Sequence, residues 1–283
     1  MKLWNRKPQS SLPGADSAPD THDFSICPEQ VQKAPPCQMQ CPNSGDIRGW
    51  LGIIAQRDKT GLSLEEAYDK AWRRLVEFNP MPATIGRICP HPCESACTRS
   101  DKDEPVSINA MERFLGDWGL ERGLHFTPLE GPSREESIGV IGSGPAGISF
   151  AYQMARRNYP VTVYERSTSP GGMLRNEIPS YRLPVDVLEG EIERIVGLGV
   201  DLQLGVEIGE GLTLDDLRER HELLFLGMGA QQAKGLGIPG EAGAGVWSGI
   251  EFLRHRKEGR HIALGSRVAV IGGGNTALDS ARS

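Results

Sequence analysis

The 283-residue sequence predicts a small α-helical domain, then a Rossmann-like α/β domain and the start of a second Rossmann-like unit. Three observations predict this order. All six cysteines lie between residues 27 and 97, among short helical patterns. From residue 138 onward, five apolar runs typical of strands occur, with helical segments between several of them: "IGVIG", "VTVYE", "VDLQLG", "LLFLGMG" and "RVAVIG". A strand that runs into a glycine-rich turn occurs twice in that part of the chain.

Composition and charge exclude several classes of protein. The formal net charge of −6 offers no basic surface for nucleic acid or for an anionic membrane. The first residues contain no apolar segment typical of a secretory signal, and no apolar run approaches the roughly 18 residues of a membrane span. We therefore expect a cytoplasmic protein without nucleic-acid or membrane partners, with about two domains for this length.

The helical domain contains two clear helix patterns. Residues 62–79 repeat apolar side chains at a spacing of three to four, behind Ser63 as an N-cap. Residues 107–123 predict a second helix. The predicted buried face of the first comprises Leu64, Ala67, Tyr68, Ala71, Trp72, Leu75 and Val76. The expected domains are a polar, flexible arm (1–24), the helical domain (25–130), the first α/β domain (131–265) and the start of the second (266–283).

The cysteines are the candidate ligands of the helical domain. They are Cys27, Cys37, Cys41, Cys89, Cys93 and Cys97. Disulfides are disfavoured because cytosolic thiols stay reduced and no export signal is present. A metal ion or a cluster is the better interpretation. Zinc stays an alternative, although closed zinc sites favour C-x₂₋₄-C pairs in sets of four. His91 is either a further ligand or an exposed loop residue.

The first glycine turn, "GSGPAG" at residues 142–147, follows the predicted strand "SIGVI". Gly142 permits the tight turn, Gly144 lets backbone approach a pyrophosphate, and Gly147 lets the following helix pack on the strand. The N-terminus of that helix offers N–H groups to phosphate. A second strand then ends in Glu165, 18 residues beyond Gly147, where an acid can accept from ribose hydroxyls. The whole pattern predicts a dinucleotide site.

A second glycine turn follows in "RVAVIGGGNTALDSAR", residues 267–282. Gly272, Gly274 and Ala277 occupy the three fingerprint positions, and alanine is a recognised variant at the third. Two dinucleotide sites indicate a bound flavin and an exchangeable nicotinamide, whereas the alternative is a repeat without a ligand. The sequence ends at Ser283 within the next helix, before the second strand of the unit, so we expect a fragment of something longer.

Six motifs together resemble the family of the glutamate synthase small subunit and the N-terminal half of dihydropyrimidine dehydrogenase. They are "PPCQMQCP", "GRICPHPCESAC", "EPVSINAMERF", "VIGSGPAGISFA", "PGGMLRNEIPSYRLP" and "VIGGGNTALD". The resemblance covers roughly residues 25–283 and extends to a flavoprotein that works with reverse-type sulfite reductase. It implies a helical domain with two 4Fe-4S clusters, then an FAD domain into which an NAD(P)H domain is inserted.

The resemblance also implies crossed ligands for the two clusters. One ligand set falls on Cys41, Cys89, Cys93 and Glu112. The other falls on Cys37, Cys97 and two upstream cysteines. Such crossing is known from two-cluster ferredoxins, where the last cysteine of a run binds the other cluster.

This sequence departs from the family pattern upstream of these ligands. The family form is C-x-x-C-x-x-x-x-C, whereas here Cys27 stands alone and nine residues separate it from Cys37. One thiolate of the second set is therefore missing. A water molecule, Asp23, Glu29 or another group would replace it, or the site holds three irons or none.

For the nucleotides, the resemblance assigns a set of contacts along the α/β part. The FAD contacts are Gly142, Ser143, Gly144, Pro145, Ala146, Gly147, Glu165, Arg166, Gly171, Gly172, Met173, Arg182 and Ile208. The contacts to the nicotinamide nucleotide are Gly272, Gly273, Gly274, Asn275 and Thr276.

The implied function is that of an oxidoreductase. It passes electrons from NAD(P)H through FAD to the 4Fe-4S clusters and on to a partner, such as an enzyme like the glutamate synthase large subunit. Hydride transfer to a flavin needs alignment rather than a protein acid or base, so no catalytic side chain is predicted. The alternative is a truncated, non-catalytic adaptor that binds a cluster or flavin and docks on a redox partner.

Overall fold

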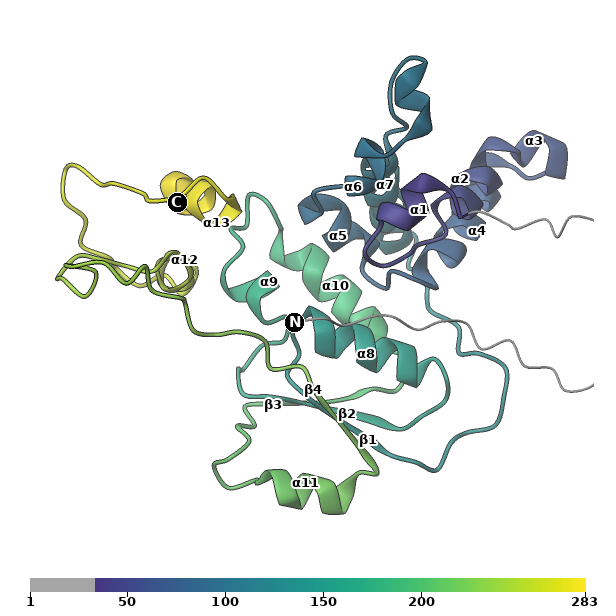
Figure 1. The fold of residues 1–283 in the computed structure, drawn as a ribbon. Coiled ribbons are helices and arrows are strands. Elements are labelled where there is room, and N and C mark those ends of the chain that lie inside the picture. The colour runs from purple at the N-terminus through teal and green to yellow at the C-terminus, as the bar shows by residue number, and fades with distance from the viewer. Residues whose placement is uncertain (1–33) are drawn as a thin grey trace, which may run out of the picture. The chain divides into compact units, whose positions relative to one another are not determined.

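The computed structural model describes residues 34–283. Its first part, up to residue 124, forms helices and turns (Figure 1). The elements are α1 (Pro36–Gln40), α2 (Ile47–Ala55), α3 (Arg57–Thr60), α4 (Leu64–Val76), α5 (Pro82–Ile88), α6 (Pro92–Ser95), a 3₁₀ turn (Thr98–Asp101) and α7 (Ile108–Glu121). The two helices that the sequence predicts most clearly, α4 and α7, are confirmed.

Helix α4 begins at the predicted cap. The Ser63 N–H donates to the Glu66 carboxylate (2.9 Å) and the Glu66 N–H donates to the Ser63 hydroxyl (3.3 Å), which completes a capping box. The buried face matches the prediction at Ala67, Ala71, Trp72, Leu75 and Val76. The prediction is wrong for Leu64, which is 46% exposed, because the first turn of the helix projects beyond the core that the later turns contact.

Helices α5 and α7 cross with their backbones in close contact. A Cβ atom on Gly116 would lie 2.1 Å from the Ala83 nitrogen, and one on Gly86 would lie 2.6 Å from the backbone of α7. The crossing is reinforced by Arg87, whose two Nη atoms donate to the two carboxylate oxygens of Asp117 (2.7 and 3.0 Å). The glycines are therefore a steric requirement of this contact.

The α/β part contains a parallel four-stranded sheet in the order β3-β2-β1-β4. The strands are β1 (Ile138–Ile141), β2 (Val161–Glu165), β3 (Asp201–Leu204) and β4 (Leu223–Leu226). Side chains alternate between the faces: Val140 and Val163 pack into the core that includes α8 (Pro145–Ala155), whereas Ile141 and Tyr164 contact α11 (Leu214–Arg220). Figure 1 shows α8 and α11 on opposite faces of the sheet. The predicted Rossmann-like arrangement is thus confirmed for four strands.

The fifth predicted strand does not form. Residues 267–272 have no strand pairing, and Val268 and Ile271 are 60% and 76% exposed. A strand is stable only when a neighbour pairs with its backbone hydrogen-bonding groups, and no described strand pairs with this segment. The remaining helices are α9 (Met173–Asn176), α10 (Val185–Val196), α12 (Gly249–Lys257) and α13 (Asn275–Arg282). Across residues 34–283, none of the helices has both the length and the apolar character that crossing a membrane requires.

Helix α10 connects the helical and α/β parts, because it packs against α5 and α7 and also against α8. Its Glu191 is fully buried, and the two carboxylate oxygens accept from the N–H groups of Ala83 (2.7 Å) and Thr84 (2.8 Å). Burial raises the pKa of Glu191 to about 7, against the lowering effect of these N–H donors and of Arg194 one turn further along.

The close crossing of α5 and α7 predicts the effect of adding one methyl group. We expect Gly116→Ala to destabilise the chain by about 2 kcal/mol or more, because the new Cβ must displace the Ala83 backbone. In Gly52→Ala, the matched control within α2, a Cβ meets nothing within 4 Å, so a gain of about 0.5–1 kcal/mol is expected from helix propensity. Chemical denaturation measures the unfolding free energy of each variant. Equal unfolding free energies for Gly116→Ala and Gly52→Ala would contradict the steric argument.

Glu191 predicts a pH dependence of stability. Because its pKa lies above the ordinary 4.5, the folded chain binds this proton more tightly than the unfolded chain, so its contribution is complete below pH 4.5 and is lost as pH rises through about 7. Relative to Glu191→Gln, the unfolding free energy of the wild type should fall by about 3 kcal/mol over this range. Denaturation at several pH values checks this, and parallel curves for the two proteins would disprove it.

Candidate functional site

The first glycine turn (residues 142–147) joins β1 to α8, and each fingerprint glycine has a separate steric reason. Gly142 is left-handed (φ 99°), and a Cβ there would lie 2.6 Å from the Gly227 carbonyl oxygen. A Cβ on Gly147 would lie 1.9 Å from the Gly142 oxygen. The start of α8 can therefore pack this closely on the end of β1 only because residue 147 has no side chain. Around Gly144, by contrast, a Cβ would meet nothing within 4 Å.

The open space at Gly144 lies at a helix N-terminus. Gly144 is the N-cap of α8, Pro145 follows it, no side chain caps the helix, and its first turn contains no acidic residue. An uncapped N-terminus presents N–H groups and the positive end of the helix dipole. These residues fit a pyrophosphate, because the backbone is accessible and no negative side chain competes for the position.

Glu165, at the end of β2, stabilises the first glycine turn. One carboxylate oxygen accepts from the Ser143 N–H (2.9 Å) and hydroxyl (2.6 Å), and the other accepts from the Ser167 N–H (2.9 Å). Burial alone would raise the pKa of Glu165, but these hydrogen bonds outweigh it and the pKa lies below its ordinary value. A carboxylate has about four acceptor positions, so one is left for a ribose hydroxyl, and that contact stays a prediction.

The GGM segment, residues Gly171–Met173, lies directly on the first glycine turn. The Gly171 N–H donates to the Ser143 carbonyl (3.1 Å) and hydroxyl (3.2 Å). Gly172 is left-handed (φ 53°), and a Cβ on it would lie 2.9 Å from the Gly144 Cα. Ser143 therefore joins the glycine turn, the end of β2 and the GGM segment, which explains why it is buried.

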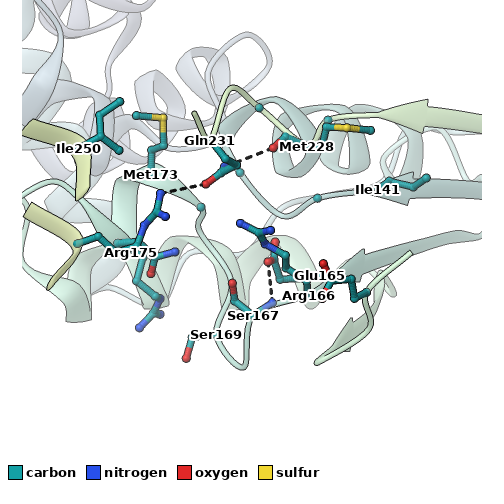
Figure 2. A pocket seen from close by; sticks show the side chains of 18 of the residues that line it. Ile141, Glu165, Arg166, Ser167, Ser169, Met173, Arg175, Met228, Gln231 and Ile250 are labelled. Carbon is teal, nitrogen blue, oxygen red and sulfur yellow. Dashed lines mark hydrogen bonds between the residues drawn. The ribbon is translucent and has the colours of Figure 1, made fainter. Parts of the chain in front are cut away.

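These segments surround a cleft of about 1810 Å³. Pockets for small molecules usually measure about 300–1,000 Å³, so this cleft has room for a dinucleotide. Figure 2 shows Glu165, Arg166 and Ser167 at one side, with Met173 and Arg175 opposite and Met228 and Gln231 from the loop after β4. Of the predicted FAD contacts, those that line the cleft are Gly142, Gly144, Pro145, Ala146, Glu165, Arg166, Gly172, Met173 and Ile208.

Several predicted contacts lie elsewhere. Ser143, Gly147 and Gly171 lie outside the cleft lining and within the hydrogen-bonded and packed support of the turn. Arg182 does not line the cleft and instead pairs with Asp279 of α13, to which Tyr181 also donates (3.2 Å). The FAD contact of Arg182 therefore stays a prediction.

The second glycine turn repeats the local geometry of the first. Gly272 is left-handed (φ 126°) and Gly274 is the N-cap of α13, as Gly142 and Gly144 are for their turn and helix. Residues 272–276 are exposed and do not line the cleft. Their contact with a nicotinamide nucleotide stays a prediction.

Basic side chains at the cleft extend the predicted set. Arg175, Arg254, Lys257 and Arg260 line it, and sequence reasoning missed them although the basic run at 254–260 was a visible signal. Arg175 pairs with Glu189 and Arg254 pairs with Glu177 (both 2.8 Å). Within residues 34–283, the predicted contact Arg166 makes no ion pair, so its guanidinium is available to an anionic ligand.

In the helical part, three cysteines lie near Glu112. Cys41 ends α1, Cys89 ends α5, Cys93 lies in α6 and Glu112 lies on α7. Burial raises the pKa of Cys93 to about 11, and the negative charges of Glu94, Cys41, Glu112 and Cys89 add to that effect. Burial likewise raises the pKa of Cys89, with Glu112 and Cys41 among its neighbours. This group is the first ligand set that the resemblance implies.

Cys37 lies near Cys97 and also near Cys41, so Cys41 has neighbours in both of the ligand sets that the resemblance implies. Burial raises the pKa of Cys37, and Cys97 and Cys41 act in the same direction. None of the five described cysteines forms a disulfide. Cys27, together with the predicted arm, lies outside the described residues.

The donor set fits iron–sulfur clusters. Several groups that become anions on ionisation are crowded in an apolar core with Ile47, Trp50 and Leu75, a position that a bound cation would stabilise. Among the described side chains, no three His, Cys, Asp or Glu residues are spaced to hold a single ion. The His91 N–H donates to the Cys89 sulfur (3.3 Å), as is usual around clusters, while its ring lies 3.2 Å from Glu94.

Glu112 is held by a buried neighbour. Its carboxylate accepts from the Asn79 amide (2.9 Å), and the Asn79 oxygen accepts from the Met81 N–H (3.1 Å). Burial raises the pKa of Glu112 despite this hydrogen bond. The glycines at the α5–α7 crossing let Cys89 and Glu112 approach the same site.

Comparisons with known proteins agree with this two-part site. The family model described as dihydropyrimidine dehydrogenase domain II, 4Fe-4S cluster, matches residues 27–124. The model described as pyridine nucleotide-disulphide oxidoreductase matches residues 136–283. The resemblance that the motifs indicate is therefore confirmed.

Three relatives illustrate the range of similar proteins. The NADP(+)-dependent formate dehydrogenase subunit beta of Moorella thermoacetica is 37% identical over 272 residues, which are 88% of this chain and 37% of that protein. The NAD-dependent dihydropyrimidine dehydrogenase subunit PreT of Escherichia coli O157:H7 is 33% identical, over 87% of this chain and 58% of that protein. The glutamate synthase (NADH) of Schizosaccharomyces pombe is 33% identical, over 87% of this chain and 12% of that protein.

The chain spans less than two thirds of the length of each of these relatives. The oxidoreductase model nevertheless covers more than half of the chain, from the first strand of the sheet to the last residue. The chain therefore belongs to the pyridine nucleotide-disulphide oxidoreductase family, and it carries a 4Fe-4S domain of the dihydropyrimidine dehydrogenase type in front of that domain.

Proposed function

We propose that this chain passes electrons from NAD(P)H through FAD to 4Fe-4S clusters and on to a partner protein. The observation that carries the proposal is the gathering of Cys37, Cys41 and Cys93 in one core of the helical part, with Cys89, Cys97 and Glu112 among their neighbours. The same chain contains a first glycine turn whose Gly144 is open to a ligand. Relatives that are named as subunits, such as the formate dehydrogenase subunit beta, support a separate partner.

The chain's own residues bind and orient, and the proposal requires no acid–base step from them. When bound, FAD would supply two-electron and one-electron chemistry, and the clusters would supply one-electron steps. The N-terminus of α8 would hold the pyrophosphate, and Arg166 would add a positive charge at the cleft. Cys41, Cys89, Cys93 and Glu112 would hold one cluster, and burial around them would tune its potential.

A second candidate function is that of an adaptor that binds a cluster and flavin without using a nicotinamide. Residues 272–276 of the second glycine turn are exposed and lie outside the lining of the cleft, which favours this candidate. The test separates the two candidates. The chain is purified without oxygen, its iron, sulfide and flavin are measured, and NADPH and NADH are added in turn. Bleaching of the flavin followed by that of the clusters supports electron transfer, whereas bound cofactors that do not respond support the adaptor.

The contrast between two glycines of the first turn predicts separable effects. Gly144→Ala should leave the stability of the nucleotide-free chain within about 0.5 kcal/mol of wild type, since its Cβ has open space. It should weaken FAD binding by about tenfold or more, because the methyl group occupies the space that a pyrophosphate needs.

Gly147→Ala is the matched comparison. Its Cβ would lie 1.9 Å from the Gly142 oxygen, so the nucleotide-free chain itself should lose about 2 kcal/mol or more. Thermal unfolding without nucleotide and titration with FAD measure the two effects. If Gly144→Ala binds FAD as the wild type does, the pyrophosphate does not lie at this turn.

The two ligand sets that the resemblance implies predict different losses of iron. Cys93→Ser should abolish the cluster held with Cys41, Cys89 and Glu112, whereas Cys97→Ser should leave that cluster in place. Iron and sulfide per chain, together with electron paramagnetic resonance of the reduced protein, measure this. Cys37→Ser serves as the control because it should behave as Cys97→Ser does. Loss of the same signal in all three variants would refute the division into two sets.

A further inference from the structure

Helix α5 begins without a cap of its own. Its N-cap, Met81, offers no side-chain hydrogen bond, and Pro82 occupies the first helical position. The N–H groups of the next two residues, Ala83 and Thr84, have no acceptor within the helix. Both are satisfied by the Glu191 carboxylate, one oxygen each at 2.7 and 2.8 Å, from a position 107 to 108 residues later in the chain.

Glu191 lies on the face of α10 that meets the helical part. On the same face, a Cβ on Gly190 would lie 3.0 Å from the Leu120 side chain, and the Arg194 guanidinium lies 5.0 Å from the centre of the Trp72 ring. Three buried apolar side chains on the neighbouring part of the helix surface, Leu188, Ile192 and Ile195, pack into a core shared by both parts of the chain, which includes Trp72 and Met81 as well as Val140 and Val163. Helix α10 therefore contacts both parts of the chain, and Glu191 makes its polar contact with α5.

The far end of α5 carries a candidate cluster ligand. Cys89 is the C-cap residue of this seven-residue helix, about 10 Å along the axis from the end that Glu191 holds. A tilt of α5 at its N-terminus would therefore move Cys89. Helix α10 itself begins at Val185, shortly after the GGM segment that lies on the first glycine turn.

We propose that Glu191 is a positioning residue that fixes α5, and with it Cys89, on the nucleotide-binding part, so that electron passage from flavin to cluster depends on it. This inference rests on the proposed function. Glu191 touches neither the cleft nor a cysteine, and it acts through the direction of α5.

The kinetic test uses the full chain loaded with FAD and clusters. Glu191→Gln replaces one acceptor with an NH₂ group that faces an N–H donor. NADPH is mixed with the protein, and the bleaching of the flavin and of the clusters is followed separately. Flavin reduction should keep its wild-type rate, while cluster reduction should slow by about tenfold or more. Glu193→Gln, an exposed carboxylate on the same helix, is the control and should change neither rate.

A second readout needs no bound cofactor. In hydrogen exchange of the cofactor-free chain, the amides of Ala83 and Thr84 should lose protection by about tenfold in Glu191→Gln and keep it in Glu193→Gln. If Glu191→Gln does not fold, Glu191→Asp, which keeps the charge but is one methylene shorter, is measured in the same way. Unchanged protection, or equal slowing of both reduction steps, would overturn the inference. A wild-type chain whose flavin ignores NAD(P)H would overturn the proposed function instead, and the exchange result would still report on the Glu191 contact.

Discussion

The close approach of α5 and α7 is the constraint on which most of the helical part depends. Gly86 and Gly116 remove the Cβ atoms that would separate the two backbones. The approach places Cys89, at the end of α5, near Glu112 on α7. It also seats Ala83 between Gly116 and the Glu191 carboxylate. One steric condition thus serves both the candidate cluster site and the junction with the α/β part.

In the nucleotide cleft, the hydrogen bonds of the Ser143 side chain play the part that the α5–α7 crossing plays in the helical part. Ser143 donates to Glu165 and accepts from Gly171, so the turn after β1, the end of β2 and the GGM segment share one buried residue. The residues that line the cleft are consequently positioned before any ligand arrives, which reduces the entropy that binding must overcome. Gly144 leaves open space in which a ligand can approach the backbone. Gly147 instead allows α8 to pack closely against the turn after β1.

Sequence patterns predicted those features of the fold that depend on residues close together in the sequence. The cap and buried face of α4, the helix α7, four strands and the first glycine turn all follow from spacing within about 20 residues. Contacts over long separations had no signal of this kind, as with Glu191 to Ala83 or Arg182 to Asp279. Residues 267–272 failed as a strand for a related reason: the apolar pattern is local, but strand formation depends on a neighbour elsewhere in the chain.

Two buried ionisable groups, Glu191 and Arg194, lie where α10 meets the helical part. Their presence there is better explained by the position in which they hold the helices than by a gain in stability. Glu191 is fully buried and Arg194 is 9% exposed, and removing two such groups from water costs free energy that apolar side chains of similar volume would not cost. Apolar contacts are non-directional and do not by themselves fix one register. A carboxylate that accepts from two particular N–H groups favours one register of α10 against α5. For the proposed electron transfer, which depends on the separation of the cofactors, a fixed register would offset this desolvation cost.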